Sequence, residues 1–200
     1  MTSLQLAAST LTDAFGRVAR DLRVSLTDRC NLRCTYCMPA DGLAWFPTED
    51  VLTDDEVVRV IGIAVERLGV EKLRFTGGEP LLRGGLEGII AATKQLRTAR
   101  GVAPETSLTT NGVGLDKRVK GLAAAGLDRV NVSLDSLDRE RYAALARRDR
   151  LPDVLAGLAA AEAAGLTPVK VNAVVMRGVN EADVVPLAAF CLARRYQLRF

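Results

Sequence analysis

One short pattern occurs three times in this chain and constrains its fold more than any other feature. Residues 68–75, 125–132 and 164–171 each run from an apolar, helix-like stretch through glycine and one apolar residue into a mixed apolar and polar stretch. Glycine at the turn can adopt the left-handed conformation that ends many helices. The alternation that follows has the two-residue period of a β-strand. The pattern therefore predicts repeated helix–turn–strand units.

The remaining elements follow from the same spacing rules. Thr53 and Glu56 form a capping-box pattern, and the helical spacing that begins there stops at Gly69. Further helices are predicted at 86–96, 115–125, 153–164 and 182–195. Strands are predicted near 22–27, 72–76, 106–110, 129–134, 168–175 and 197–200.

Strands that alternate with helices form parallel sheets with right-handed crossovers. We therefore predict an α/β fold, a partial (β/α)6 TIM-type barrel of parallel strands with outer helices, truncated at the sixth strand. A doubly wound sheet is the alternative. The chain has 200 residues, enough for one domain. We expect residues 1–20 to pack on the barrel as an N-terminal segment and residues 21–200 to form the partial barrel. The final strand-like residues, 197–200, favour a fragment or a natural truncation.

Composition excludes several classes of function. The net charge of +3 is too small to indicate a nucleic-acid partner or an acidic membrane surface. The sequence has no apolar run of about 20 residues and no secretory signal pattern, so we expect a cytoplasmic protein without a membrane partner. Histidine is absent, which removes histidine zinc sites and Ser–His or Cys–His nucleophile pairs. The chemistry must use thiolates, carboxylates, Lys, Tyr or a bound cofactor.

Three of the four cysteines, Cys30, Cys34 and Cys37, lie within eight residues after the first predicted strand. An odd number of thiols cannot pair completely as disulfides, and structural zinc requires four ligands. Cys191 lies far along the chain in an apolar helix and is predicted to be a small buried hydrophobic residue. Soft thiolates favour iron–sulfur clusters or zinc. The triad therefore favours an iron–sulfur cluster with one iron left without a protein ligand; zinc and unligated thiols remain alternatives.

Polar residues occupy every second position of the predicted strands, where buried parallel strands are usually apolar throughout. The other positions are apolar and should pack on the helices, so the polar row should face the barrel interior. A polar interior needs a polar occupant, and its cations favour an anion such as a phosphate ester. The alternative is a solvated, open sheet face. The row consists of Arg23, Ser25, Arg74, Thr76, Ser107, Thr109, Asn131, Ser133, Lys170 and Asn172.

Two motifs follow predicted strands directly. Residues 76–80, Thr-Gly-Gly-Glu-Pro, would let the backbone approach a ligand closely and place Glu79 at the carboxyl end of a strand, where such folds have their active sites. Residues 109–112, Thr-Thr-Asn-Gly, end the next strand. Each is also an ordinary turn signal. We expect the charged run 147–150 to be a solvated loop, and Trp45 and Phe46 either to cover a cluster or to pack on the first helix.

Together these motifs resemble the radical S-adenosylmethionine (SAM) superfamily and, within it, the GTP 3′,8-cyclases. These lyases catalyse the first step of molybdenum cofactor (molybdopterin) biosynthesis. The resemblance extends from about Phe15 to Phe200. It rests on the cysteine triad with Tyr36 before its third member, on residues 76–80, and on segments 16–17, 21–31, 108–112, 131–135 and 169–172.

The resemblance implies a site for each of three groups. It implies that three irons of a [4Fe–4S] cluster are bound by Cys30, Cys34 and Cys37. It implies that the SAM site is lined by Tyr36, Gly78 and Ser133, and that Asn172 and the Glu79 loop support this site. It implies that GTP is held by Arg23, Arg74, Thr109 and Lys170.

The resemblance also implies a reaction and partners. A 5′-deoxyadenosyl radical would remove hydrogen from C3′ of GTP, and C3′ would then attack C8 to give 3′,8-cyclo-7,8-dihydro-GTP. An electron donor and a downstream pathway enzyme would be partners, and a homodimer is left open. A second [4Fe–4S] cluster would be bound by a C-terminal region that is absent from these 200 residues. The alternatives are another radical SAM enzyme acting on a peptide or small molecule, and a non-catalytic zinc- or iron-binding module.

Overall fold

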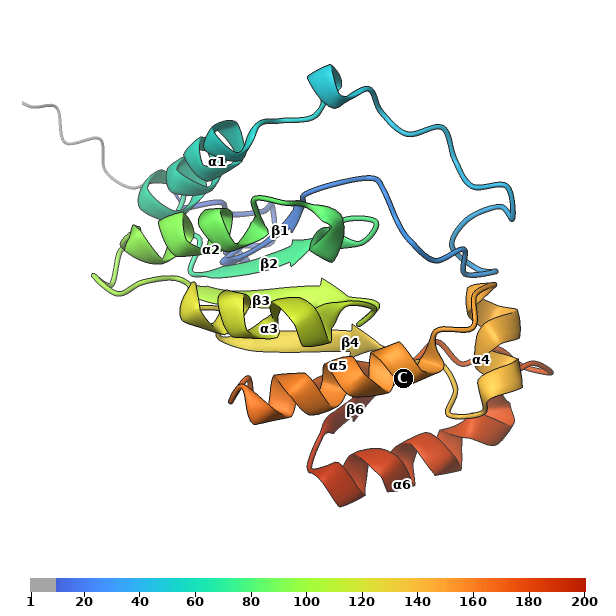
Figure 1. The fold of residues 1–200 in the computed structure, drawn as a ribbon. Helices are drawn as coiled ribbons and strands as arrows, with labels where there is room; N and C mark the ends of the chain where they lie inside the picture. Colours follow the sequence, from blue (N-terminus) through green and yellow to red (C-terminus); the bar gives the residue numbers. More distant parts are fainter. Residues whose placement is uncertain (1–9) are drawn as a thin grey trace, which may run out of the picture.

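The computed structural model describes residues 10–200 and contains a six-stranded parallel sheet with its strands in sequence order (Figure 1). The strands are β1 (Asp21–Ser25), β2 (Lys72–Thr76), β3 (Glu105–Thr110), β4 (Arg129–Ser133), β5 (Lys170–Asn172) and β6 (Gln197–Arg199). Strands β1 and β6 are the two edges, so the sheet is not closed. Sequential parallel strands joined by crossovers of one hand place their helices on one face. The predicted partial barrel is therefore confirmed, and the doubly wound alternative, which requires a reversal of strand order, is wrong.

Six α-helices connect or flank these strands within the described residues. They are α1 (Asp54–Arg67), α2 (Leu86–Gln95), α3 (Leu115–Ala124), α4 (Arg139–Ala146), α5 (Leu151–Ala163) and α6 (Val184–Arg194). Single 3-10 turns lie at η1 (Thr48–Asp50), η2 (Pro80–Leu82) and η3 (Glu181–Asp183). The predicted capping box is present, with Glu56 N donating to Thr53 Oγ1 and Thr53 N to Glu56 Oε2.

Helix α4 was not predicted from the sequence. It is short, highly charged and lacks a long apolar stripe, so its spacing does not distinguish it from a loop. Its start is fixed locally, because the Asp138 carboxylate accepts a hydrogen bond from the backbone N–H of Arg141 at 2.8 Å. Strand β5 is shorter than predicted, covering three residues of the expected 168–175.

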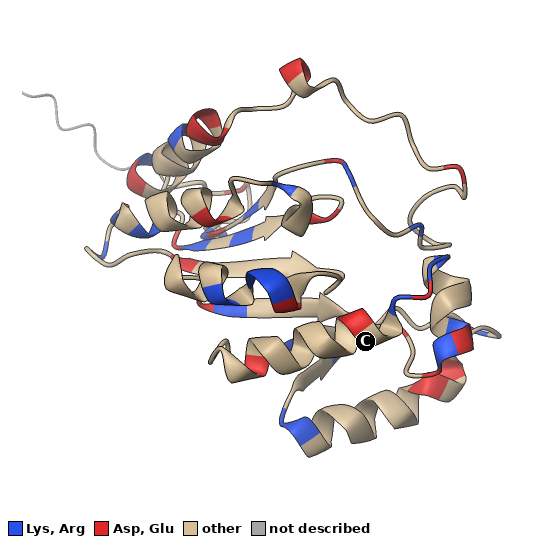
Figure 2. Ribbon diagram, viewed as in Figure 1, with Lys and Arg blue, Asp and Glu red and all other residues tan. Residues whose placement is uncertain are grey.

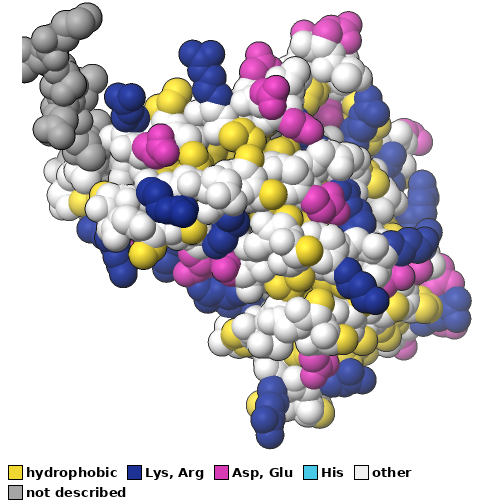
Figure 3. Space-filling view, turned by 60° about the vertical axis from the view of Figure 1, so that its left-hand side comes forward, with side chains coloured by type: hydrophobic (Ala, Val, Ile, Leu, Met, Phe, Trp, Pro, Cys, Tyr) yellow, Lys and Arg dark blue, Asp and Glu magenta, His cyan; other side chains and the backbone are white. Residues whose placement is uncertain are grey.

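The core lies between the sheet and its outer helices. Phe75, Leu108, Val130 and Val171 are fully buried, and each occupies the apolar face of its strand. They pack with helix residues such as Ile61, Ile90, Leu122 and Leu158 in one apolar cluster. The predicted division into an apolar outer row and a polar inner row is therefore confirmed in β1, β2, β4 and β5, whereas in β3 the buried outer face holds Thr106 and Thr110 on either side of Leu108. Outside the core, cationic and anionic side chains are interspersed over the helical surface (Figure 3).

Helices α3 and α5 approach each other closely at Gly157. A Cβ atom there would lie 2.6 Å from the Gly112 carbonyl oxygen and 3.1 Å from Leu115 Cβ. We expect Gly157→Ala to lower the free energy of unfolding by about 1–3 kcal/mol, because a backbone atom blocks the added methyl group. Gly88→Ala is the matched control, since a Cβ there meets nothing within 4 Å, and it should stabilise helix α2 slightly. Denaturant unfolding would measure both, and equal stability of the two variants would contradict this packing.

Residues 10–20 precede the sheet as an exposed segment with an antiparallel bridge between Thr12 and Val18. It joins the sheet where the backbone N–H of Glu71 donates to the carbonyl of Arg20 at 2.9 Å. Residues 1–9 lie outside the described part, so the division at residue 20 stays a prediction. Among the described residues, every helix is too short or too polar to cross a bilayer.

Candidate active site

The cysteine loop leaves the carboxyl end of β1 (Figure 1). It carries three free thiols. Cys30 and Cys34 are half-buried, and Cys37 is exposed. The Cys34 carbonyl accepts hydrogen bonds from the backbone N–H groups of Cys37 at 2.9 Å and Met38 at 3.1 Å, so the loop turns tightly between the last two thiols. Burial, then the negative charges of Asp135, Cys30 and Cys37, raises the pKa of Cys34 to about 11. The thiols therefore share one electrostatic environment.

This donor set fits an iron–sulfur cluster. Among residues 10–200, no three thiol or carboxylate side chains converge on a point that one metal ion could occupy. In a [4Fe–4S] cluster each cysteine binds a different iron, so the thiols need not converge. Three free, soft sulfur donors in one loop can bind three irons and leave the fourth open to another ligand.

Helix α4 holds this loop in place. The backbone N–H groups of Arg33 and Thr35 donate to the last carbonyls of α4 at 3.1 and 2.9 Å. Arg147, which ends the helix with a φ of 52°, donates from Nη1 to the carbonyls of Arg33 at 3.3 Å and Met38 at 3.1 Å. The expectation that the whole run 147–150 is a solvated loop is therefore wrong for Arg147, which is half-buried against the cysteine loop.

Arg33 stiffens the same loop from within. Its Nη1 donates to the carbonyls of Cys30 at 2.7 Å and Leu32 at 2.8 Å. Its guanidinium lies 5.4 Å from the centre of the Trp45 ring. Trp45 therefore packs on the cysteine loop through a cation–π contact, a role that neither sequence-based alternative included.

The paired glycines of the 76–80 motif lie directly against the cysteine-bearing segment. A Cβ atom on Gly77 would overlap the carbonyl oxygen of Thr27, and one on Gly78 would overlap the carbonyl oxygen of Arg29. The backbone N–H groups of Gly78 and Glu79 donate to these same two carbonyls, each at 2.7 Å. The paired glycines therefore let this motif approach the protein's own chain closely, and the predicted approach to a ligand stays a prediction.

We expect Gly78→Ala to reduce cluster loading and to lower stability by at least about 1–3 kcal/mol, because the added methyl group must displace the segment leading to Cys30. Gly84→Ala is the control, since a Cβ there meets nothing within 4 Å. Iron content after reconstitution and thermal unfolding would measure the two effects. A Gly78→Ala protein with unchanged iron content and stability would contradict the packing of these two loops.

Glu79 is fully buried and joins the ends of β2 and β3. Its Oε1 accepts from Leu81 N at 3.0 Å and Thr110 Oγ1 at 2.7 Å, and its Oε2 accepts from Asn111 N at 2.7 Å. Burial raises the pKa of Glu79, and these hydrogen bonds oppose the shift. Asn111 in turn donates from Nδ2 to Asn31 Oδ1 at 2.7 Å, so the loops after β1, β2 and β3 form one connected network.

Tyr36 is anchored across the sheet by a buried carboxylate. Its hydroxyl donates to Asp135 Oδ2 at 2.7 Å, and Asp135 Oδ1 accepts from Val174 N at 2.9 Å. Burial raises the pKa of Asp135. The structure therefore brings Tyr36 to the end of β4, which also carries Ser133, while Gly78 lies in the loop two residues after the end of β2. No local sequence signal assigns Asp135 a role, although it belongs to the segment 131–135 on which the family resemblance rests.

The predicted inner row is aligned across the sheet. Arg23 pairs with Arg74, and Arg74 with Ser107, while Thr109 pairs with Asn131 and Asn131 with Lys170. A cavity of about 310 Å³ on this face is lined by Arg23, Arg74 and Lys170, together with other charged and polar side chains. Thr109 lies one layer nearer the carboxyl ends and receives a hydrogen bond from Asn131 Nδ2 at 3.4 Å.

Two further cations, Lys72 and Arg129, line this cavity and were missed in the sequence. Both occupy inner-row positions at the amino ends of their strands, so the same alternation could have identified them. Figure 2 shows Lys and Arg on the strands of the sheet as well as on the helices. Arg129 is ion-paired with Glu105, which leaves the cavity's positive charge mainly on the other cations. Arg23 and Arg74 remain exposed because the sheet is open on this side.

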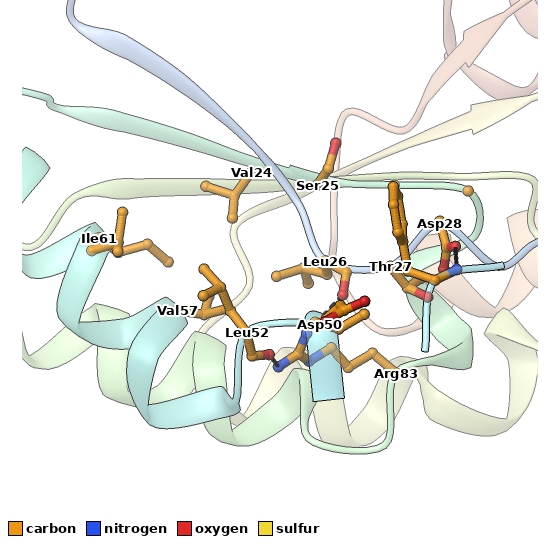
Figure 4. A pocket seen from close by; sticks show the side chains of 15 residues that line it. Val24, Ser25, Leu26, Thr27, Asp28, Asp50, Leu52, Val57, Ile61 and Arg83 are labelled. Carbon is orange, nitrogen blue, oxygen red and sulfur yellow. Dashed lines mark hydrogen bonds between the residues drawn. The ribbon is translucent and has the colours of Figure 1, made fainter. Parts of the chain in front are cut away.

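A separate hollow of about 430 Å³ lies between β1, α1 and residues 46–52 (Figure 4). Its walls are mainly apolar and include Val24, Leu26, Val57 and Ile61. Arg83 at its border donates to Asp54 Oδ1 at 2.8 Å and to two backbone carbonyls. Its chemistry therefore differs from both the thiol loop and the cationic inner face.

Comparison with known families decides the affiliation. The sequence matches the Radical SAM superfamily over residues 24–191, which include the thiol loop, the 76–80 motif and the inner row from Ser25 to Asn172. The chain belongs to the radical SAM superfamily. Solved structures share its fold. Streptococcus suis SuiB bound to S-adenosylmethionine has a TM-score of 0.69 at 20% identity, covering 88% of this chain and 37% of SuiB. Native anSMEcpe with bound AdoMet has a TM-score of 0.70 at 20% identity, covering 89% and 50%.

Curated relatives of this radical SAM chain are much more similar in sequence. A GTP 3′,8-cyclase of Corynebacterium glutamicum is 67% identical over 190 residues, covering 95% of this chain and 50% of the relative. GTP 3′,8-cyclase 2 of Mycobacterium tuberculosis is 66% identical over 189 residues, covering 94% and 51%. The radical SAM chain thus spans about half the length of the curated relatives it matches.

Proposed function

We propose that this chain is the radical-generating and GTP-binding part of a GTP 3′,8-cyclase, which carries out the first step of molybdenum cofactor biosynthesis. The observation that carries the proposal is the joint placement of two sites. A three-thiol loop lies at the carboxyl end of the sheet, and a cationic inner row lies in the same sheet. Relatives named GTP 3′,8-cyclase, 61–67% identical over nearly the whole chain, support this reading.

In this proposal Cys30, Cys34 and Cys37 hold a [4Fe–4S] cluster whose fourth iron takes SAM. When bound, the reduced cluster and SAM would supply a 5′-deoxyadenosyl radical for hydrogen removal from C3′ of the GTP ribose. The SAM-lining residues are Tyr36, Gly78 and Ser133. Their placement at the ends of β2 and β4 and in the cysteine loop supports a common site, because ligands of parallel α/β folds bind at the carboxyl ends of strands.

GTP would be held by Arg23, Arg74, Thr109 and Lys170. Guanidinium and ammonium groups bind phosphate through charge-assisted hydrogen bonds, and three such groups line one cavity. This cavity lies toward the amino ends of the strands, and the thiol loop lies at the opposite ends. If GTP bound with its triphosphate in this cavity, its ribose would point toward the thiol loop. There the chain must fix the position of the ribose and exclude water.

The proposal includes partners outside the chain. An electron donor must reduce the cluster, and a downstream enzyme must consume the cyclised nucleotide. We also propose cytoplasmic activity and a second [4Fe–4S] cluster in a C-terminal region of the complete enzyme. A homodimer is compatible with the proposal but is not required by it.

The first experiment uses the anaerobically reconstituted chain. The iron and sulfide content of the chain would be measured, and the release of 5′-deoxyadenosine from SAM would be measured with and without GTP. We expect about four irons per chain bound at the three thiols, and SAM cleavage that responds to GTP. Release that ignores GTP would favour a radical SAM enzyme with a peptide or another small-molecule substrate. A zinc protein, or a cluster that never cleaves SAM, would favour a non-catalytic module.

A second experiment tests the cyclisation itself. The matching part of the Corynebacterium glutamicum relative would be replaced by this chain, which covers 50% of that protein at 67% identity. We expect the chimera to form the cyclised nucleotide from GTP. A chimera that folds, binds its clusters and cleaves SAM, yet leaves GTP unchanged, would reject the proposed substrate.

A further inference from the structure

We propose that Asn111 is a positioning residue that donates a side-chain hydrogen bond to the thiolate of Cys30 and thereby raises the reduction potential of the cluster. The inference rests on the proposed function only in requiring a cluster at Cys30. It does not depend on GTP as the substrate.

The geometry points to this bond. Asn111 Nδ2 lies 3.8 Å from Cys30 Sγ and 2.7 Å from Asn31 Oδ1. A side-chain amide nitrogen carries two hydrogens, so it can donate to both acceptors at once. The contact spans 81 positions of sequence and joins the loop after β3 to the loop after β1.

The orientation of the Asn111 amide is fixed by its other partners. Its Oδ1 accepts a hydrogen bond from Val113 N at 3.0 Å, and its backbone N–H donates to the buried Glu79 carboxylate at 2.7 Å. A flipped amide would place two oxygens against each other at Asn31 and an NH₂ group against the Val113 N–H. The nitrogen must therefore face the sulfur.

A donor aimed at a cluster ligand has a defined electrostatic effect. Reduction adds one negative charge to the cluster and its thiolates, and an N–H group pointing at a thiolate stabilises that charge. Hydrogen bonds to sulfur are among the means by which proteins set cluster potentials. Removing the donor should therefore make the cluster harder to reduce.

The test is a redox titration of the reconstituted, SAM-free chain. Asn111→Ser keeps a short side-chain oxygen for Val113 N and loses the reach to Cys30. Asn111→Asp keeps the shape of the side chain but adds a negative charge, which by itself would change the reduction potential. The neutral Asn111→Ser variant is therefore the one that tests the hydrogen bond. We expect the ratio of reduced to oxidised cluster at a fixed potential to fall about tenfold in Asn111→Ser, equivalent to about 59 mV for one electron. An unchanged ratio at wild-type iron content would overturn the proposal.

Asn31→Ala is the comparison variant. It removes the competing acceptor and leaves the Asn111 amide free to donate to Cys30, so the potential should be no lower than that of the unsubstituted chain. If the reduction potential fell equally in Asn31→Ala and Asn111→Ser, it would depend on the overall structure of the loop. That result would reject a specific hydrogen bond from Asn111 to Cys30.

If the Asn111 variants take up no cluster, the unsubstituted chain still provides the test. With asparagine labelled by ¹⁵N only in its side chain, the reduced cluster should show a nitrogen hyperfine coupling that persists in Asn31→Ala. Absence of that coupling would overturn the proposal. A chain that shows the coupling but ignores GTP would reject the proposed substrate and keep this inference, while a chain without any cluster would reject both.

Discussion

Cys34→Ala is expected to abolish assembly of the iron–sulfur cluster and, with it, all cleavage of SAM. Each of the three loop thiols would bind a different iron, so each is needed. Mutation of residues that only hydrogen-bond to metal ligands lowers metal affinity or activity by about 10–100-fold. The effect of removing a ligand itself should therefore be larger than that. Iron and sulfide content, visible absorbance and 5′-deoxyadenosine release would measure the effect.

Cys191→Ala is the matched control. Cys191 is buried in α6 with 1% of its surface exposed, and it belongs to the apolar core. Its replacement should lower stability modestly through a small cavity and leave iron content and SAM cleavage unchanged. If Cys34→Ala retained a full cluster, or if Cys191→Ala lost it, the assignment of the loop thiols as ligands would be wrong.

Joint replacement of Arg74 and Lys170 by alanine is expected to weaken GTP binding by about 10²–10⁴-fold. Both line the cavity on the inner sheet face. A hydrogen bond to a charged group contributes about 1.5–3 kcal/mol, and each 1.4 kcal/mol is tenfold in affinity. Equilibrium dialysis with labelled GTP would measure the change. The affinity of the unsubstituted chain should also fall as salt is added.

Arg67→Ala is the control for this pair, because Arg67 is an exposed arginine in the last turn of α1, on the helical side of the sheet. It should bind GTP with unchanged affinity. Cluster content should be the same in all the variants, since none of the three residues contacts the cysteine loop in the hydrogen-bond network. Equal GTP binding by the double variant and the Arg67 control would place the nucleotide elsewhere.

The fold was largely predictable because its signals are local. Glycine turns such as Gly69, Gly126 and Gly165, each with positive φ, separate helix spacing from strand alternation. The inner cations could be found by the same alternation, since Arg23, Arg74 and Lys170 face one cavity. Helix α4 could not be found this way, because its eight residues begin with three charged ones and span too few turns for apolar spacing to identify a helix.

The sequence by itself determined the donor atoms, the strand–helix repeat and the two faces of each strand, because these depend on residue type and on spacing over a few positions. Only the tertiary structure decided which groups hold the site. Arg147 meets Arg33 across 114 positions, Tyr36 meets Asp135 across 99, and Asn111 meets Cys30 across 81. Such contacts arise when a parallel sheet brings the ends of successive strands to one edge, and their hydrogen bonds depend on distances that no local pattern encodes.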